Sequence, residues 1–415
     1  MAILKDYIYN PRNPYPAYAW LRSQSRPYFY RREQSWLVSR YEQVAFVLRD
    51  SRFSKQLPAE DRSPLSNTML FQDPPNHRRL RDAVVQAFAE RPMENIQKSI
   101  RIVADRLIDQ VEANSQMDFI QQFAGPLPVA IIADMLGVDS GDIKSIQEWT
   151  EALVRAGVPG ESNADLLHAG AKAVTSMGHF FADLINDSCS LSKENLLSSL
   201  IRPISALPHG KLSEDELIGT CMLLMIAGHE TTINLLGNGL YLLLTHPEQL
   251  ALLRSDDSLI ANAIEEVLRF ESPVQRGTYR CTKEAVEVGE VLIPAGSIVV
   301  ALIGAANRDP VIFENPDTFN ILRNPNPHLG FGQGIHFCLG ASIARQEALI
   351  ALTRLLHRLP NINLLIQKQQ SISKRRRLFN ILSGRSLSLF SQGTFIPSWS
   401  HNPIVRGLTS LPITW

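Results

Sequence analysis

The sequence has few cysteines and no excess of charge of either sign. Its four cysteines are Cys189, Cys221, Cys281 and Cys338, and no two have the short spacing of a zinc site or a redox dithiol. The 41 basic and 41 acidic residues give a formal net charge of zero, which leaves no electrostatic footprint for nucleic acid or an anionic membrane. These absences favour a reduced, cytoplasmic protein with no nucleic-acid partner.

The chain also lacks a targeting segment, a repeat and a linker. Its start, MAILKDYIYNPRNPYPAYAW, has an apolar stretch of four residues followed by charge and proline, so we expect neither a signal peptide nor a membrane anchor. No repeat and no glycine- or serine-rich linker divides the 415 residues, of which 45% are hydrophobic. We therefore expect one composite domain over residues 1–415 with a large core.

Apolar periodicity predicts a mainly helical chain with small sheets. NPYPAYAWLRSQ reads as a proline-started helix, and alternation in PYFYRREQSWLVSRY predicts a short hairpin. From DPPNHRRLRDAVVQAF to about Leu244, apolar spacings of three and four indicate helices. AVEVGEVLIPAGSIVVALIG then alternates like strands, and ASIARQEALIALTRLLHRL returns to helix. Residues 371–395, with four successive basic residues and scattered serines, are typical of a solvated surface loop.

One long helix is expected from about Ser213 to Leu244. Ser213 and Glu216 form a capping-box pattern at its start, and Pro247 marks the start of the next helix. Nearly every position between them is apolar until the run GHETT, residues 228–232. Buried polar groups without partners are costly, so the presence of these polar residues in the middle of an apolar helix requires an explanation.

Several explanations of GHETT are open from the residues alone. A zincin would need a second histidine four residues after His229, and position 233 is Ile233, which excludes that motif. The threonines could bond to the preceding helical turn and merely bend the helix. Alternatively, Glu230 and Thr231 beside Gly228 would suit proton delivery to a small ligand held against the helix.

A glycine-rich loop near the C-terminus surrounds one cysteine. GFGQGIHFCLG, residues 330–340, places Cys338 among four glycines, with His336 two residues before it. Glycines at this density let the backbone lie close against another group. A lone cysteine is ordinarily a buried structural residue, so this loop indicates a function only in combination with other motifs.

Two charged pairs share helix faces. Glu266 and Arg269 are three residues apart, and His77 and Arg81 are four apart. Taken singly, each pair is typical of a solvated helix surface.

Read in order, these motifs resemble those of the cytochrome P450 family, of the soluble bacterial kind. FGQGIHFCLG is similar to the family's haem-binding loop, AGHETT to its oxygen-binding helix, and Glu266 with Arg269 to its ExxR motif. DPPNHRRLR, ANRDP and RGLTSLPITW follow the family's order, so the resemblance covers nearly the whole chain. It implies the P450 fold: mainly α with small β-sheets, in a single triangular-prism-like domain around haem. Glu266 and Arg269 would then form a buried network with Arg323, and residues 371–395 look like an inserted surface loop.

The resemblance implies haem b (iron protoporphyrin IX) as the cofactor and Cys338 as the metal ligand, the axial thiolate of the iron. The loop glycines would let the backbone approach the porphyrin and aim N–H groups at the sulfur. The buried propionates of the porphyrin need cations, which the family pattern assigns to two histidines and two arginines. The implied haem-contacting residues are His77, Arg81, Ala227, Gly228, Arg280, Phe331, Gly332, Gly334, His336, Cys338, Leu339 and Gly340.

On the oxygen side, the resemblance assigns Glu230 and Thr231 to proton delivery as the catalytic pair, beside a groove at Ala227 and Gly228. It implies a monooxygenase of secondary metabolism that inserts one O2-derived atom into a hydrophobic small molecule: a polyketide or macrolide, a fatty acid or a terpenoid. GFGQG lacks the strand and helix context of a dinucleotide-binding motif, and no iron–sulfur motif occurs. A ferredoxin and its reductase are therefore implied as electron donors to a monomeric enzyme.

Two other functions remain open. A haem-thiolate protein could bind a gas or ligand without turnover, but it would not need the pair Glu230 and Thr231. A peroxide-driven enzyme would tend to lack that pair.

The resemblance also places the substrate. Contacts are expected from residues around 57–70, from Leu224 and Ala227, from 274–278, and from Ile404 and Val405. Most of these residues are apolar, and Arg276 or Gln275 could meet a carboxylate if it points inward.

Overall fold

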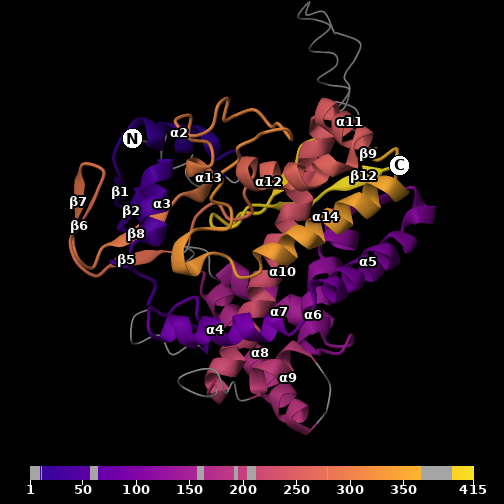
Figure 1. Cartoon of the computed structure of the whole chain (residues 1–415), viewed down its shortest axis with the longest axis horizontal. Helices are drawn as coiled ribbons and strands as arrows, with labels where there is room; N and C mark the ends of the chain where they lie inside the picture. Colours follow the sequence, from indigo (N-terminus) through magenta and orange to yellow (C-terminus); the bar gives the residue numbers. More distant parts are fainter. Residues whose placement is uncertain are drawn as a thin grey trace, which may run out of the picture.

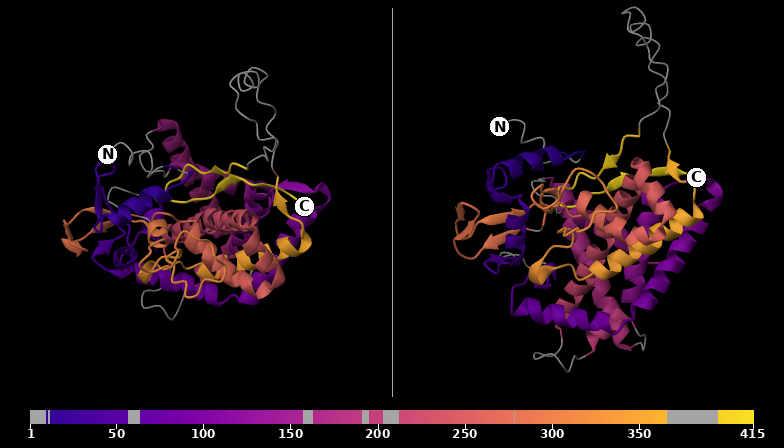
Figure 2. Two further views of the ribbon diagram at one scale, coloured as in Figure 1. Left: turned by 90° about the horizontal axis from the view of Figure 1, so that it is seen from above. Right: turned by 45° about the horizontal axis from the view of Figure 1, so that its top comes forward.

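The computed structural model describes residues 10, 12–56, 64–156, 163–190, 195–202, 212–277, 279–365 and 395–415. Of the predicted surface loop at 371–395, all but the last residue lie outside these ranges. The described chain is mainly helical with small sheets, as its apolar periodicity predicts. Its outline in Figure 1 narrows from α2 and α11 at the top to α9 at the bottom, and Figure 2 shows two further views.

Thirteen α-helices occur in the described ranges. They are α2 (Tyr15–Ser23), α3 (Tyr41–Arg49), α4 (Asn76–Ala89), α5 (Met93–Asp109), α6 (Pro126–Leu136), α7 (Ile143–Ala156), α8 (Ala164–Ser190), α9 (Leu196–Ile201), α10 (Glu214–Thr245), α11 (Pro247–Ser255), α12 (Ile260–Phe270), α13 (Ile303–Ala306) and α14 (Ala341–Arg358). Short 3-10 helices are η1 (Pro64–Asn67), η2 (Glu112–Asn114), η4 (Asp257–Leu259) and η5 (Gly334–His336), and η3 (Ile120–Ala124) is a π-helix. None of the helices in the described ranges is both long and apolar enough to span a bilayer.

The strands form small sheets, the largest of which has five strands in the order β1-β2-β8-β5-β3. A second sheet has the order β4-β12-β9, and β6 with β7 and β10 with β11 form two-stranded pairs. Only β2 and β8 run parallel among these named strands. The strands are β1 (Tyr28–Tyr30), β2 (Ser35–Val38), β3 (Phe53–Ser54), β4 (Gln116–Asp118), β5 (Arg280–Thr282), β6 (Val286–Val288), β7 (Val291–Ile293), β8 (Ile298–Ala301), β9 (Asn363–Leu364), β10 (Ser398–Trp399), β11 (Leu408–Ser410) and β12 (Pro412–Thr414).

The central helix is α10, which confirms the long helix predicted from the sequence. Its N-terminus carries the expected capping box: the Glu216 N–H donates to the Ser213 hydroxyl over 3.3 Å, and the Ser213 N–H donates to the Glu216 carboxylate over 2.9 Å. The helix packs against α6, α8, α12 and α14, so it is enclosed on several sides. Its 32 residues, at about 1.5 Å each, extend across the whole molecule (Figure 1).

The loop of residues 330–340 links the two parts of the fold. Upstream, the five-stranded sheet packs with α3 around a core that includes Val38, Val44 and Val299. Downstream, α14 starts at Ala341 and packs against α5, α10 and α12 in the main helical core. The glycine-rich loop therefore lies where sheet, α10 and α14 come together.

Candidate active site

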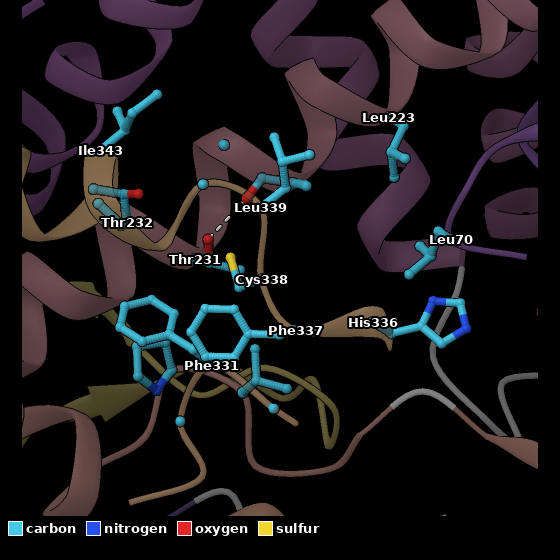
Figure 3. Close-up of a pocket in the computed structure, with 18 of the residues that line it drawn as sticks. Leu70, Leu223, Thr231, Thr232, Phe331, His336, Phe337, Cys338, Leu339 and Ile343 are labelled. Carbon is cyan, nitrogen blue, oxygen red and sulfur yellow. Dashed lines mark hydrogen bonds between the residues drawn. The ribbon is translucent and has the colours of Figure 1, made fainter. Parts of the chain in front are cut away.

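A mostly apolar cavity of about 340 Å³ lies between α10, the start of α14 and the loop 330–340 (Figure 3). Its volume falls in the range of small-molecule sites. The apolar walls come mainly from α6 and α10, and include Met69, Leu70, Phe88, Ile131, Ile132, Met135, Leu223, Leu224, Leu235 and Val274. The polar side chains that line it are Lys55, Arg81, Thr231, Thr232, Arg280, Gln333, His336, Cys338 and Glu347. The cavity thus suits a hydrophobic ligand with a few polar groups at defined places.

Cys338 lines this cavity from the glycine-rich loop. Its backbone N–H donates to the Phe331 carbonyl over 2.9 Å, and the Gly340 backbone hydrogen-bonds its sulfur. Burial raises the pKa of the Cys338 thiol, whereas the Gly340 bond and the charges of Arg81 and Arg345 act in the opposite direction. A metal cation at the sulfur would reverse the effect of burial, because a coordinating thiol is deprotonated outright. The loop is therefore suited to hold a thiolate on a metal.

Different structural constraints favour glycine at different positions of the loop. Gly332 and Gly334 adopt φ values of +71° and +74°, a region that favours glycine. A Cβ at Gly334 would also lie 2.7 Å from the Leu48 carbonyl oxygen at the end of α3, and Gly334 does not line the cavity. Gly340 lines the cavity, and a Cβ there would have no protein atom within 4 Å. Glycine at position 340 therefore leaves room for the close approach of a ligand. Glycine at position 334 instead avoids a clash with the backbone of α3.

Basic side chains gather at one end of the cavity. Arg81, Arg280 and His336 line it, and Arg81 donates from Nη2 to the Phe337 carbonyl over 2.8 Å. His77 lies behind His336, with the two ring centroids 4.4 Å apart, and does not itself line the cavity. Lys55 joins this group, and the sequence reasoning missed it.

This cluster is deficient in negative charge. Burial lowers the pKa of His336 to about 2, and the charges of Lys55, His77, Arg280 and Arg81 act in the same direction. The one carboxylate among the described lining residues is Glu347, which belongs to α14. An excess of basic side chains at one end of an otherwise apolar cavity is complementary to an anionic ligand group.

The GHETT turn of α10 combines two of the explanations left open by the sequence. The Thr231 hydroxyl donates to the Ala227 carbonyl over 2.8 Å, which is the bond to the preceding turn (Figure 3). Ala227, Gly228 and Thr231 nevertheless line the cavity. A Cβ at Gly228 would meet only the Ile132 side chain, at 3.7 Å. Without a Cβ, the surface of α10 at this position is open, and no neighbouring residue blocks it. Thr231 thus bonds its own helix and still faces the cavity.

Glu230 is not among the residues that line the cavity. It is partly buried, and burial together with the charge of Glu151 on α7 raises its pKa to about 7. A carboxyl group with this pKa exchanges its proton near neutral pH, but it has no direct face on the cavity in this conformation. Of the predicted pair, Thr231 therefore faces the cavity, whereas Glu230 faces the neighbouring helix α7.

A buried acid from α14 takes a place that the sequence reasoning did not foresee. Glu347 is 4% exposed and lines the cavity, where it hydrogen-bonds Thr232. Burial raises its pKa to about 8, against the opposing effect of that bond. The available signal was helical spacing: Glu347 lies four residues after Ile343, on the face that follows the cysteine loop. This acid therefore keeps its proton to a higher pH than an ordinary glutamic acid and can donate it.

The predicted buried network of Glu266, Arg269 and Arg323 is confirmed. Arg269 donates from Nε and Nη2 to the two carboxylate oxygens of Glu266, each over 2.7 Å, and both side chains are 0% exposed. Arg323 donates to the same carboxylate over 3.1 Å. This network lies away from the cavity, so its role is structural.

The proposed carboxylate anchor Arg276 is wrong. Its Nη2 lies 2.7 Å from the Glu33 carboxylate, the side chain is 4% exposed, and neither Arg276 nor Gln275 lines the cavity. Ile404 and Val405 do not line it either, because this segment runs beside residues 274–276: the Ile404 carbonyl accepts the Gln275 N–H over 2.8 Å. Of the expected substrate contacts, those that do line the cavity are Met69, Leu70, Leu224, Ala227, Val274 and Gly277. Residues 57–63 and 278 lie outside the described ranges.

Comparison with known sequences gives consistent matches. The family model described as Cytochrome P450 matches residues 182–379. Cytochrome P450 107B1 of Saccharopolyspora erythraea is 42% identical over 346 residues, which cover 80% of this chain and 83% of that protein. The cytochrome P450 monooxygenase PikC of Streptomyces venezuelae is 36% identical over 414 residues, covering 97% and 91%. The biotin biosynthesis cytochrome P450 of Bacillus subtilis is 41% identical over 363 residues, covering 85% and 91%.

Solved structures agree. P450BioI in complex with an acyl carrier protein that bears hexadec-9Z-enoic acid superposes with a TM-score of 0.85 at 37% identity, covering 98% of this chain and 99% of that chain. The cytochrome P450 PksS of the Bacillus subtilis bacillaene polyketide synthase gives 0.83 at 33% identity, covering 99% and 97%.

Proposed function

The chain belongs to the cytochrome P450 family of haem-dependent, oxygen-incorporating oxidoreductases, and on that premise we propose that it is a monooxygenase of hydrophobic small molecules. The fold is accordingly the P450 fold, mainly α with small β-sheets in a single domain, and the cofactor is haem. The observation that carries the proposal is that Cys338 and Thr231 line the same apolar cavity, one from the loop and one from α10.

The residues of the cavity fit haem. Cys338 would be the axial ligand, and His77, Arg81, Arg280 and His336 would hold the propionates, which supply the negative charge that the cationic end lacks. Ala227, Gly228, Phe331, Gly332, Leu339 and Gly340 line the cavity and would pack against the ring. Gly334 would support haem binding indirectly, because it lets the loop pack closely against α3.

When bound, the haem supplies the redox chemistry that cleaves O2 and inserts one oxygen atom into the substrate, and its thiolate ligand favours O–O cleavage. The chain's part is to keep the sulfur available and to set its basicity. The Gly340 backbone bond and the charges of Arg81 and Arg345 do this by stabilising the thiolate.

Proton delivery would use the polar turn of α10. The Thr231 hydroxyl donates to Ala227, so its oxygen can still accept a hydrogen bond from the cavity. Glu230, whose pKa burial raises to about 7, would take up protons beside α7 and pass them toward Thr231 through water or a side-chain movement. Glu347, on the other side of α10, is a second acid that reaches the cavity directly.

The substrate is proposed to be a polyketide or macrolide, a fatty acid or a terpenoid. The apolar walls of the cavity support a hydrophobic molecule, and Arg276 offers no anchor because it pairs with Glu33. The similar proteins include PikC, 6-deoxyerythronolide B hydroxylase, the polyketide biosynthesis P450 PksS and the biotin biosynthesis P450, which favours secondary metabolites or acyl chains.

The remaining features of the proposal concern the whole chain. Electrons would come from a ferredoxin and its reductase, because the sequence has no flavin or iron–sulfur motif of its own. Cys221, Cys281 and Cys338 are unpaired, which supports a reducing, cytoplasmic location. We further propose that residues 1–415 form one monomeric domain, with 371–395 inserted as a surface loop.

An optical titration of the ferric protein tests this function. Fatty acids, macrolactones and terpenoids are added in turn, and the Soret band reports the spin-state change that follows displacement of the iron-bound water. A hit is then incubated with a ferredoxin, its reductase and NADPH, and an oxygenated product is expected. Spin-state shifts without any oxygenated product from the shifting ligands would favour a ligand-binding protein instead.

A further inference from the structure

A carboxylate on α12 joins the two flanks of the loop that carries Cys338. Glu265 accepts a hydrogen bond over 2.9 Å from Nε2 of His328, which precedes the loop. It also accepts two from Arg345, which follows the loop on α14: Nε donates to Oε1 over 2.6 Å, and Nη2 donates to Oε2 over 2.8 Å. None of these three side chains lines the cavity, so they act on Cys338 only through the loop.

The His328 ring links Glu265 to the start of the loop. The Gly330 backbone N–H donates to His328 Nδ1 over 3.0 Å, so the ring proton lies on Nε2, from which it is donated to Glu265. The His328 side chain is 4% exposed, so both bonds are shielded from water. The carboxylate thus fixes the tautomer and the orientation of the ring that holds the Gly330 backbone.

Arg345 links Glu265 to the next residue of the loop, Phe331. The Arg345 Cζ lies 4.4 Å from the centroid of the Phe331 ring, within the range of a cation–π contact. The Phe331 carbonyl in turn accepts the Cys338 N–H over 2.9 Å. The two connections from Glu265 therefore converge on residues 330 and 331, which hold the Cys338 backbone.

The two connections differ in burial. The Arg345 and Glu265 side chains are 37% and 28% exposed, and an ion pair that water reaches contributes little by itself. The bond to the buried His328 ring is better shielded. We therefore expect this bond to contribute most of what Glu265 does for the loop.

We propose that Glu265 is a positioning residue for the axial ligand: through His328 and Arg345, it holds the loop so that the Cys338 thiolate stays on the haem iron. Two neighbouring acids of α12 then have separate roles, because Glu266 bonds Arg269 and Arg323 instead. The inference rests on haem ligation by Cys338 and not on the oxygenation proposed above. A wild-type protein without a thiolate spectrum would refute that ligation before any variant is compared.

The test follows the thiolate band of the ferrous–carbonyl complex in wild-type holoprotein and three variants, and measures how fast warming abolishes it. Glu265→Met removes three hydrogen bonds to a charged group, so it should lose the thiolate form about tenfold faster or more. Glu265→Gln keeps one acceptor oxygen and should lie between that variant and wild type. In His328→Asn the side chain can still accept the Gly330 N–H, as asparagine does two residues along the chain, but it is too short to reach Glu265. Its rate should approach that of Glu265→Met.

The matched control is Asp257→Asn. Asp257 makes the same kind of bond to a histidine, His357 in the last turn of α14, over 2.6 Å. The two side chains are 61% and 53% exposed, and the pair lies at the end of α14 away from the loop. The rate of Asp257→Asn should therefore stay near wild type.

A second readout separates positioning from general stability. The iron–sulfur stretching band in the resonance Raman spectrum of the ferric holoprotein should shift in Glu265→Met, and in His328→Asn if the methionine variant does not accumulate as holoprotein. A rate near wild type with an unchanged stretching band overturns the proposal. So does a faster loss of the thiolate form that only follows a lower unfolding midpoint while the stretching band is unchanged, because Glu265 would then stabilise the fold in general.

Discussion

Removing Arg269 should destabilise the protein far more than removing a surface arginine that makes the same two-pronged contact with a carboxylate. Arg269 is 0% exposed and donates to both oxygens of Glu266 and to the carbonyls of Asn307, Pro316 and Thr318 over 2.7–3.1 Å. It therefore ties α12 to the segment that leads into the cysteine loop. Among the described residues, Arg269→Met would leave the Glu266 carboxylate with Arg323 as its one remaining cation. It would also remove the arginine donor from the Asn307 and Pro316 carbonyls, whereas the Thr318 carbonyl keeps a bond from Arg323.

The magnitude follows from the cost of breaking a buried pair, which is about 3–5 kcal/mol. At about 2.1 cal/mol/K per residue, unfolding 415 residues has an entropy of about 0.9 kcal/mol/K. The unfolding midpoint of Arg269→Met should then fall by about 3–6 °C. Haem content at purification should fall with it, because the displaced segment supports the loop that carries Cys338.

Arg354→Met is the matched control. Arg354 makes the same two-pronged contact with Asp105, at 2.8 Å for both bonds, but the two side chains are 40% and 32% exposed. An exposed pair contributes at most about 1 kcal/mol, so its midpoint should move by about 1 °C or less. The assay is thermal unfolding of the holoproteins followed by far-UV circular dichroism. Equal shifts for the two variants would refute the reasoning from burial.

Three further predictions concern the site. Thr231→Ala should retain haem and substrate binding but divert electrons to hydrogen peroxide; measuring peroxide and product per NADPH decides, and unchanged coupling would contradict the assigned role. Cys338→His should lose the thiolate spectrum of the ferrous–carbonyl complex, and a variant that keeps it would place the ligand elsewhere. Burial raises the pKa of Glu230 from 4.5 to about 7, so the folded state holds this proton more tightly than the unfolded state, and wild-type stability falls as pH rises through this window. Glu230→Gln removes that loss, so its unfolding midpoint relative to wild type should rise between pH 5 and pH 8, and a difference that does not change with pH would count against the burial of this acid.

Local patterns in the sequence were sufficient to predict the main elements. The capping box at Ser213 and the proline at 247 bound the central helix correctly because both act within one turn of the chain. The hairpin at residues 28–38 followed from its alternation. The spacing of Glu266 and Arg269 placed them on one face, although only the family resemblance implied that the pair would be buried.

Features that depend on distant partners could not be predicted in this way. Arg276 looked free to bind a carboxylate because its partner, Glu33, lies 243 residues earlier in the chain. Lys55 gained its position from the pairing of β3 with β5, two strands of two and three residues that no local pattern specifies. Glu230 faces α7 rather than the cavity because of the rotation of α10 against its neighbours, which the apolar periodicity of a nearly all-apolar helix does not fix.

Two acids on different elements now bracket the threonines of α10. Glu230 lies toward α7, whereas Glu347 comes from α14 and hydrogen-bonds Thr232. Burial raises the pKa of both acids, to about 7 and about 8, so both can exchange protons near neutral pH. Under the proposed function, the route of proton delivery would depend on which acid reaches the Thr231 hydroxyl when the cavity holds its ligands.

The most direct measurement of the central claim is the origin of the oxygen atom in the product. The holoprotein is supplied with a ligand that shifts its Soret band, a ferredoxin, its reductase and NADPH under 18O2, and the product is analysed by mass spectrometry. A monooxygenase predicts one 18O atom in each product molecule. A product that carries oxygen only from water, or no oxygenated product despite electron transfer to the haem, would contradict the account.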